Sequence, residues 1–245
     1  MCPVAVLTLT ATEACAMNSF ILRVACVVLW LPGLAAAAST AQRELADVLR
    51  ATPDAVNGEA LFGHCASCHG ADGGGVADGS TPRIAGQHFR ALAKQLVDFR
   101  AGKRWDFRME GAAEKHHLTG PQDIADVAAY VSQLTRPDTR GIGSGEFVEK
   151  GSRIYAAQCQ SCHGANAEGT QEGVPRLAGQ HYAYLMRQMY DAVDGRRPAL
   201  SRLHSKRIAP FDFEQVRAIS DYLARIGWQG GDSMQTAAPK PHPAP

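Results

Sequence analysis

The chain has 245 residues and a formal net charge of +1, so it is neither strongly basic nor strongly acidic. This balance gives no sign of a nucleic-acid partner, and none is expected. The length suits one or two domains of ordinary size after any leader is removed.

The first 38 residues have the pattern of a secretory signal. An apolar run covers residues 20–34, and four alanines at 35–38 follow it as a small-residue cleavage site, with cleavage near Ala38. The positively charged start of such a signal is poor at Met1 but acceptable if translation begins at Met17. A retained membrane anchor is the alternative, although the run is short for a spanning helix. The signal predicts export to the periplasm.

The segment Cys65-Ala-Ser-Cys68-His69 is the first of two motifs that carry chemistry. Two thiols one helical turn apart can reach both vinyl groups of one porphyrin, and the histidine that follows then lies under the iron. Cys-x-x-Cys-His is the attachment signature of c-type haem.

The same motif recurs as Cys159-Gln-Ser-Cys162-His163. Three of the seven cysteines lie within the first 38 residues, so the predicted mature chain keeps four, and all four belong to the two motifs. The sequence therefore predicts two covalently attached haem c groups as cofactors, with His69 and His163 as proximal iron ligands.

The two motifs belong to an internal duplication. Pro82-Arg-Ile-Ala-Gly-Gln-His88 matches Pro175-Arg-Leu-Ala-Gly-Gln-His181 at an offset of 93 residues, while the haem cysteines are offset by 94. We expect a signal peptide at 1–38, domain 1 at 52–135, a linker at 136–144, domain 2 at 145–228 and a disordered tail at 229–245.

Each copy is predicted to be helical. Apolar residues recur at helical spacing in the middle helices, which start near His88 and His181, and Gly102 and Gly195 are expected to end them. No strand-like alternation is present, so the predicted fold class is all-α.

The order of motifs resembles the dihaem cytochrome c4 family. The resemblance rests on the paired Cys-x-x-Cys-His-Gly and Pro-Arg-x-Ala-Gly-Gln-His motifs, on Phe99-Arg-Ala-Gly-Lys-Arg104 and on Asp123-Ile-Ala-Asp-Val-Ala-Ala-Tyr130. It implies two tandem cytochrome c domains related by a pseudo-two-fold axis. It also implies a periplasmic electron carrier, soluble or loosely attached to the membrane, whose partners are terminal oxidases, reductases or dehydrogenases. Histidine and methionine are the axial ligands implied for each iron.

The resemblance also assigns roles around each haem. The carbonyl groups of Pro82 and Pro175 are expected to accept the second imidazole N–H, which would fix the ring orientation. Loop stiffening is the alternative role for these prolines. Arg83 and Arg176 are candidates for pairing with haem propionates, and a solvated loop position is the alternative.

Copy one offers Met109 as the sixth ligand, somewhat further upstream of the closing helix than the family pattern. The adjacent pair His116 and His117 lies in the corresponding loop and competes with it.

Copy two departs from the family because no methionine lies between Met189 and the end of its closing helix. His204 occupies the expected place when residues are counted back from Tyr222. We therefore expect His204 as the sixth ligand, with an open or water-bound iron, or an unforeseen ligand, as alternatives. No ligand role is assigned to His64, His88 or His181.

The leading functional prediction is a carrier of single electrons between respiratory partners rather than an enzyme. The alternatives are a haem enzyme with an open second iron, similar to thiosulfate dehydrogenase or to a peroxidase, and a haem subunit of a larger oxidoreductase. No spare cysteine remains in the predicted mature chain for sulfur chemistry.

Overall fold

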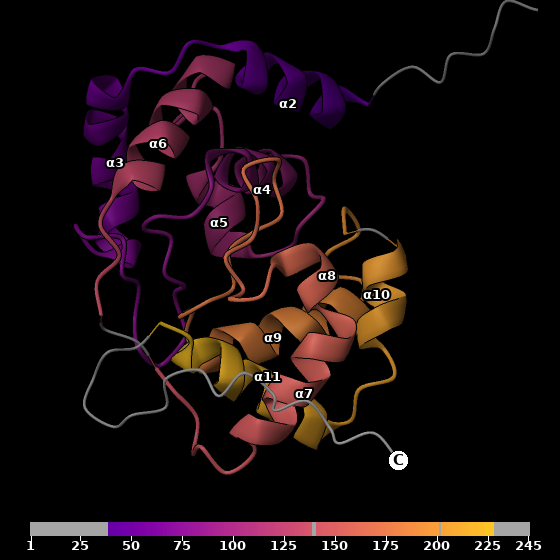
Figure 1. The fold of residues 1–245 in the computed structure, drawn as a ribbon. Helices are drawn as coiled ribbons and strands as arrows, with labels where there is room; N and C mark the ends of the chain where they lie inside the picture. Colours follow the sequence, from indigo (N-terminus) through magenta and orange to yellow (C-terminus); the bar gives the residue numbers. More distant parts are fainter. Residues whose placement is uncertain (1–38, 139–140, 201, 228–245) are drawn as a thin grey trace, which may run out of the picture. The chain divides into compact units, whose positions relative to one another are not determined.

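The computed structural model describes residues 39–138, 141–200 and 202–227. The predicted signal peptide and the predicted disordered tail lie outside these residues. The described residues contain helices and loops and no β-strand, so the fold is all-α as predicted (Figure 1).

The helices fall into two sets that follow the duplication. The first set is α2 (Thr40–Arg50), α3 (Ala55–His69), α4 (Phe89–Arg100), α5 (Phe107–Ala112) and α6 (Pro121–Gln133). The second set is α7 (Val148–Gln158), α8 (Gln160–His163), α9 (Tyr182–Val193), α10 (Arg202–Ile208) and α11 (Phe213–Arg225).

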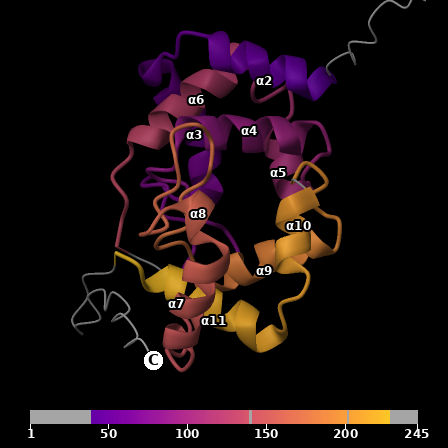
Figure 2. The same ribbon diagram turned by 45° about the vertical axis from the view of Figure 1, so that its right-hand side comes forward.

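In each domain the helix that leads into the haem motif crosses the closing helix at close range, α3 over α6 and α7 over α11 (Figure 2). A Cβ at Gly58 would overlap the backbone carbonyl of Asp126, and a Cβ at Gly151 would overlap that of Ala218. Glycine is therefore required at both crossings because the two backbones touch. The ring pairs Phe62–Tyr130 and Tyr155–Tyr222 also repeat, with centroids 5.4 and 5.6 Å apart.

The middle helices have the predicted ends. His88 and His181 are the N-cap residues of α4 and α9. Two residues beyond each helix, Gly102 and Gly195 adopt φ of +63° and +78°. This left-handed conformation ends a helix at little cost only for glycine.

One difference between the domains lies at the haem motif. α3 runs without interruption to His69, whereas α7 ends at Gln158 and the separate turn α8 carries the second motif. Domain 2 has one extra residue between Tyr155 and Cys159 compared with domain 1, which accounts for the change of offset from 93 to 94. The extra residue is accommodated by a break in the helix at Cys159, where φ is −121° and ψ is −35°.

A second difference is α2, which lies ahead of the predicted start of domain 1. Its Val48 is fully buried and packs into the cluster that holds Val97 and Ile124. Glu44 on α2 also forms a 2.5 Å ion pair with Arg100, whose guanidinium donates to the carbonyls of Ala113 and Leu118. α2 therefore fixes the loop that leads into α6.

Candidate haem sites

The first motif occupies the last turns of α3. Cys65 is partly buried, Cys68 is exposed, and neither thiol is in a disulfide. His69 ends the helix and is 5% exposed, and its Nδ1 donates to the carbonyl of Pro82 at 2.9 Å. Burial lowers the pKa of His69, which favours the neutral ring that binds metal.

The second motif has the same arrangement despite the break between α7 and α8. His163 is 8% exposed, and its Nδ1 donates to the carbonyl of Pro175 at 3.1 Å. Burial lowers the pKa of His163 and raises the pKa of the Cys159 thiol to about 11. In both copies Nε2 is the ring nitrogen left for a metal.

Domain 2 places a second imidazole near the proximal one. His204 lies on α10, and its ring centroid is 6.3 Å from that of His163, with an angle of 66° between the planes. Burial and, after it, the charges of His163, Arg197 and Arg207 together lower the pKa of His204 to about 4, so the ring is neutral at ordinary pH.

This spacing fits one iron between the two rings. Metal–nitrogen bonds of about 2 Å on each side, with each nitrogen about 1 Å from its ring centre, give roughly 6 Å between centroids. The geometry therefore matches the separation that His163 and His204 would have as axial ligands of one haem.

The candidates in domain 1 separate into two groups. Met109 lies partly buried on α5, whose N-cap Asp106 accepts from the backbone N–H groups of Arg108 and Met109. His116 is exposed and pairs with Glu114 at 3.2 Å. The ring of His117 stacks on His64 at 3.7 Å and also lies against the ring of His116. The rings of the histidine pair are thus engaged with each other and with His64.

Arg83 and Arg176 lie at the contact between the two domains. Arg83 is 4% exposed and donates through Nη1 to the carbonyl of Gly179 at 2.8 Å. Nε of Arg176 is buried without a hydrogen-bond partner. A propionate carboxylate is a suitable acceptor for such a group. Neither arginine occupies the fully solvated loop position that was the alternative.

The contacts between the domains come in exchanged pairs. The Gln87 side chain donates to the Arg176 carbonyl at 3.0 Å, and the Gln180 side chain donates to the Arg83 carbonyl at 2.8 Å. Likewise Nε2 of His88 donates to the Glu168 carbonyl, and Nε2 of His181 donates to the Gly74 carbonyl. Each contact recurs with the roles of the copies exchanged, as a pseudo-two-fold axis requires. His88 and His181 therefore hold the domains together.

Two further arginines meet near this pseudo-axis. Arg104 and Arg197 are equivalent by the offset of 93, and both donate to Oε1 of Gln95, at 2.6 and 3.2 Å. Arg104 also donates to the equivalent glutamine, Gln188, at 2.6 Å. Burial and the charge of Arg104 lower the pKa of Arg197 to about 10.

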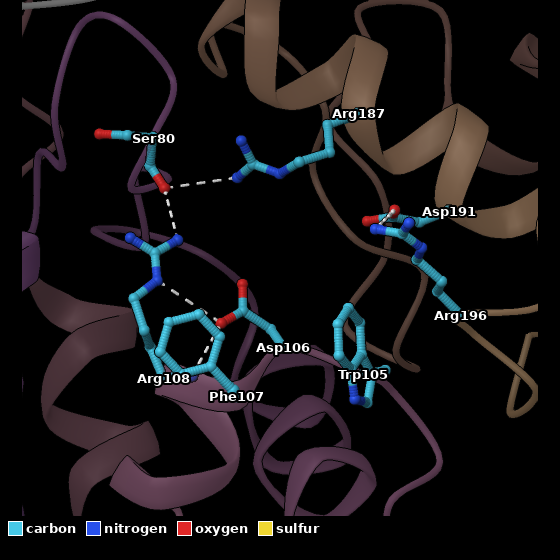
Figure 3. A pocket seen from close by; sticks show the side chains of 8 residues that line it. All are labelled: Ser80, Trp105, Asp106, Phe107, Arg108, Arg187, Asp191 and Arg196. Carbon is cyan, nitrogen blue, oxygen red and sulfur yellow. Dashed lines mark hydrogen bonds and ion pairs between the residues drawn. The ribbon is translucent and has the colours of Figure 1, made fainter.

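A cleft of ≈ 380 Å³ opens between the domains and is lined mainly by charged side chains (Figure 3). Arg108 of domain 1 and Arg187 of domain 2 both donate to the carbonyl of Ser80. The charges of Arg108 and Asp106 act on the pKa of His69, so the cleft lies on the side of the first haem site. Its arginines suit the carboxylates of a haem.

The described residues include no cluster of three or more His, Cys, Asp or Glu side chains that could hold a metal ion. Within the same residues no helix is long and apolar enough to cross a membrane.

Two haem-attachment motifs, each on its own helical domain, define a dihaem c-type cytochrome. The model of the cytochrome c family matches residues 55–135 and again 148–227. A cytochrome c4 from Pseudomonas aeruginosa is 32% identical over 188 residues, which are 73% of this chain and 92% of the relative. The chain belongs to the cytochrome c4 family.

Two other relatives extend this comparison. The crystal structure of reduced recombinant cytochrome c4 from Pseudomonas stutzeri matches with a TM-score of 0.64 and 29% identity, covering 71% of this chain and all of that one. A thiosulfate dehydrogenase electron acceptor from Stutzerimonas stutzeri is 32% identical over 210 residues, covering 80% of this chain and 94% of the relative. The protein is a dihaem electron carrier that binds two covalent haem c groups and exchanges electrons with redox partners.

Several residues of the site were not predicted. Five residues form hydrogen bonds at the contact between the domains, which the sequence of one copy does not show: Arg108, Arg187, Arg197, Gln95 and Gln188. The offset of 93 relates Arg104 to Arg197 and Gln95 to Gln188, and this equivalence was the available signal.

Proposed function

We propose that the protein carries single electrons through two unequal haems, one ligated by His69 and Met109 and the other by His163 and His204. The observation that carries the proposal is the 6.3 Å separation of the His163 and His204 rings. Cys65, Cys68, Cys159 and Cys162 supply the thioether bonds.

A bound haem supplies an iron that changes by one electron, and its axial ligands set the potential within a range of roughly 0.8 V. The residues of the chain hold that iron in fixed coordination. Pro82 and Pro175 orient the proximal rings, and α10 holds His204 against the opposite face. Arg83, Arg176 and the arginines of the cleft neutralise the propionates.

The different sixth ligands of the two haems set the direction in which electrons pass between them. Methionine raises the potential of a haem relative to a second histidine. We infer that electrons enter at the second haem, which has the lower potential, and come to rest on the first.

We place this carrier in the periplasm, because c-type haem attachment and the apolar leader both fit export. The proposed partners are dehydrogenases as donors and terminal oxidases or reductases as acceptors, with loose membrane association allowed. The relative that acts as an electron acceptor for thiosulfate dehydrogenase supports a donor of the dehydrogenase class.

We also propose domain limits of 52–135 and 145–228, with 136–144 as the linker. The matches of the family model at 55–135 and 148–227 fall within these limits.

The test uses carbon monoxide, which binds reduced haem iron only when an axial position is open. We expect the reduced protein to resist carbon monoxide at both haems, and His204→Ala to make one haem reactive. His116→Ala is the matched control, because this exposed histidine holds no iron in the proposal, and it should leave both haems unreactive. A second haem that already binds carbon monoxide in the unmodified protein would favour a haem enzyme with an open iron.

A further inference from the structure

The chain around His204 is strongly basic. Residues 195–208 contain five cations and no carboxylate. The five are Arg196, Arg197, Arg202, Lys206 and Arg207. A run of this kind has a large net charge within a short length and affects the approach of charged partners.

The equivalent chain in domain 1 does not have this character. By the offset of 93 it covers residues 102–115, which hold four cations and three carboxylates. The two segments descend from one duplicated unit, so the fold itself does not require a basic segment at this place. The excess of positive charge is a feature of domain 2 alone. Only the segment that would hold the second haem is basic.

The structure places much of this charge on the surface. Arg202, Lys206 and Arg207 are exposed on α10, while His204 on the same short helix is partly buried and lies near His163. The side chain of Leu203 is 67% exposed among these cations. α10 thus has one side at the haem site and another at the solvent.

Three acidic side chains flank this segment in the sequence, and one of them, Asp194, is exposed directly before it. Asp191 lies 3.9 Å from Arg196, and its side chain is 13% exposed against 52% for that arginine. Asp212 accepts from the backbone N–H of Gln215 as the N-cap of α11. α10 itself has three exposed cations and no carboxylate, so the charge that this helix presents to solvent is positive.

We propose that α10, with the exposed Leu203 on the same helix as Arg202, Lys206 and Arg207, is the docking surface for an acidic electron-donor protein. This inference rests on the proposed function, because it makes α10 the entry point to the second haem. Opposite charges raise the rate of encounter and orient the partner, and an exposed leucine provides an apolar contact. Docking there brings the partner's redox centre to the helix that holds His204.

The experiment measures electron transfer with small charged probes on the intact holoprotein. The fully reduced protein is mixed in a stopped-flow instrument with hexacyanoferrate(III), an anion, or with tris(1,10-phenanthroline)cobalt(III), a cation. The phase of the first haem is recognised by the return of the methionine sulfur-to-iron band, and the other phase belongs to the second haem. The variant Arg202→Glu/Lys206→Glu is compared with Arg90→Glu/Lys115→Glu, an exposed domain 1 pair with the same change of charge.

With the anion at low salt, we expect the Arg202→Glu/Lys206→Glu variant to slow the second haem by about tenfold, and salt to reduce the difference. The domain 1 pair should leave that phase within about twofold of the unmodified protein, and the cation should show the opposite trend. Equal effects of the two double variants, or a second phase independent of salt, would overturn the inference.

Failure of the proposed function has a different signature. If no phase shows a methionine band, the axial assignment of the first haem is wrong whatever the charge dependence. A normal band with no effect of α10 charge rejects the docking surface alone.

Discussion

Gly58 marks the point where the backbones of α3 and α6 touch, and Gly151 marks the same point in domain 2. A side chain at either position would meet a carbonyl group that cannot move without bending the closing helix. The haem motif begins two turns later on the same helix, so the crossing also sets where Cys65 and His69 lie.

Gly58→Ala should lower the free energy of unfolding of domain 1 by about 1–3 kcal/mol, because the added methyl group separates two packed helices. Gly63→Ala is the matched control on the same helix, since no atom lies within 4 Å of its Cβ position. That change should stabilise by about 0.5–1 kcal/mol through helix propensity. Urea titration of the holoprotein measures both, and a Gly58→Ala protein as stable as the unmodified one would contradict the packing argument.

Met109 carries the second residue-scale prediction. Met109→Ala should remove the methionine sulfur-to-iron absorbance of the oxidised protein and lower the potential of one haem, because a thioether favours reduced iron. Near-infrared spectra and a spectroelectrochemical titration follow both quantities. His117→Ala serves as the control and should leave the band in place, since this ring stacks on His64. Loss of the band in the control instead would make His117, or its stacking, essential to the first haem.

Residue roles could be predicted where one motif dictates the chemistry. Each of the pentapeptides at 65–69 and 159–163 is enough to predict that haem c is the cofactor and that it is attached covalently. Counting back from Tyr222 also predicted His204 as the sixth ligand, and the structure places its ring 6.3 Å from that of His163, while the ligation itself stays a prediction. The pairing of Arg83 and Arg176 with haem propionates stays a prediction, and their contacts across the domains were not predicted because those depend on how two separate surfaces meet.

At the scale of elements, α2 distinguishes the two domains. In domain 1, Val97 is 1% exposed beneath this added helix, whereas its equivalent Tyr190 in domain 2 is 38% exposed. The helix was not predicted because it lies outside the repeated unit, so the duplication gave no signal for it. Its capping box at Ser39 and Gln42 is a local signal that was available.

Val48→Ala should lower the free energy of unfolding of domain 1 by about 1–3 kcal/mol, because a fully buried side chain loses two methyl groups. Val56→Ala is the matched control, since Val56 is largely exposed, and should change stability by less than about 0.5 kcal/mol. Denaturant titration followed at the haem absorbance reports each domain. Equal effects of the two substitutions would show that α2 does not contribute to the core.

The break between α7 and α8 is an element-scale feature that the sequence could have shown. One inserted residue shifts the offset from 93 to 94 within a few positions of Cys159. A helix cannot absorb one residue without rotating all later residues by about 100°, so the chain breaks and restarts to keep His163 aligned.

At the scale of the whole molecule, the exchanged contacts around Gln87 and Gln180 join two similar domains in one arrangement. The similar sequences of the copies explain why each contact occurs twice. The differences between the copies, α2 in domain 1 and the basic α10 in domain 2, give the two domains different surfaces. A carrier that receives an electron at one haem and passes it from the other needs such a difference.

Two irons with different axial ligands should be distinguishable in the electron paramagnetic resonance spectrum of the oxidised protein. We expect two low-spin signals of equal intensity, one typical of histidine–methionine ligation and one of bis-histidine ligation. Two histidine–methionine signals, or a high-spin signal from the second iron, would contradict the unequal ligation on which the proposed direction of electron flow depends.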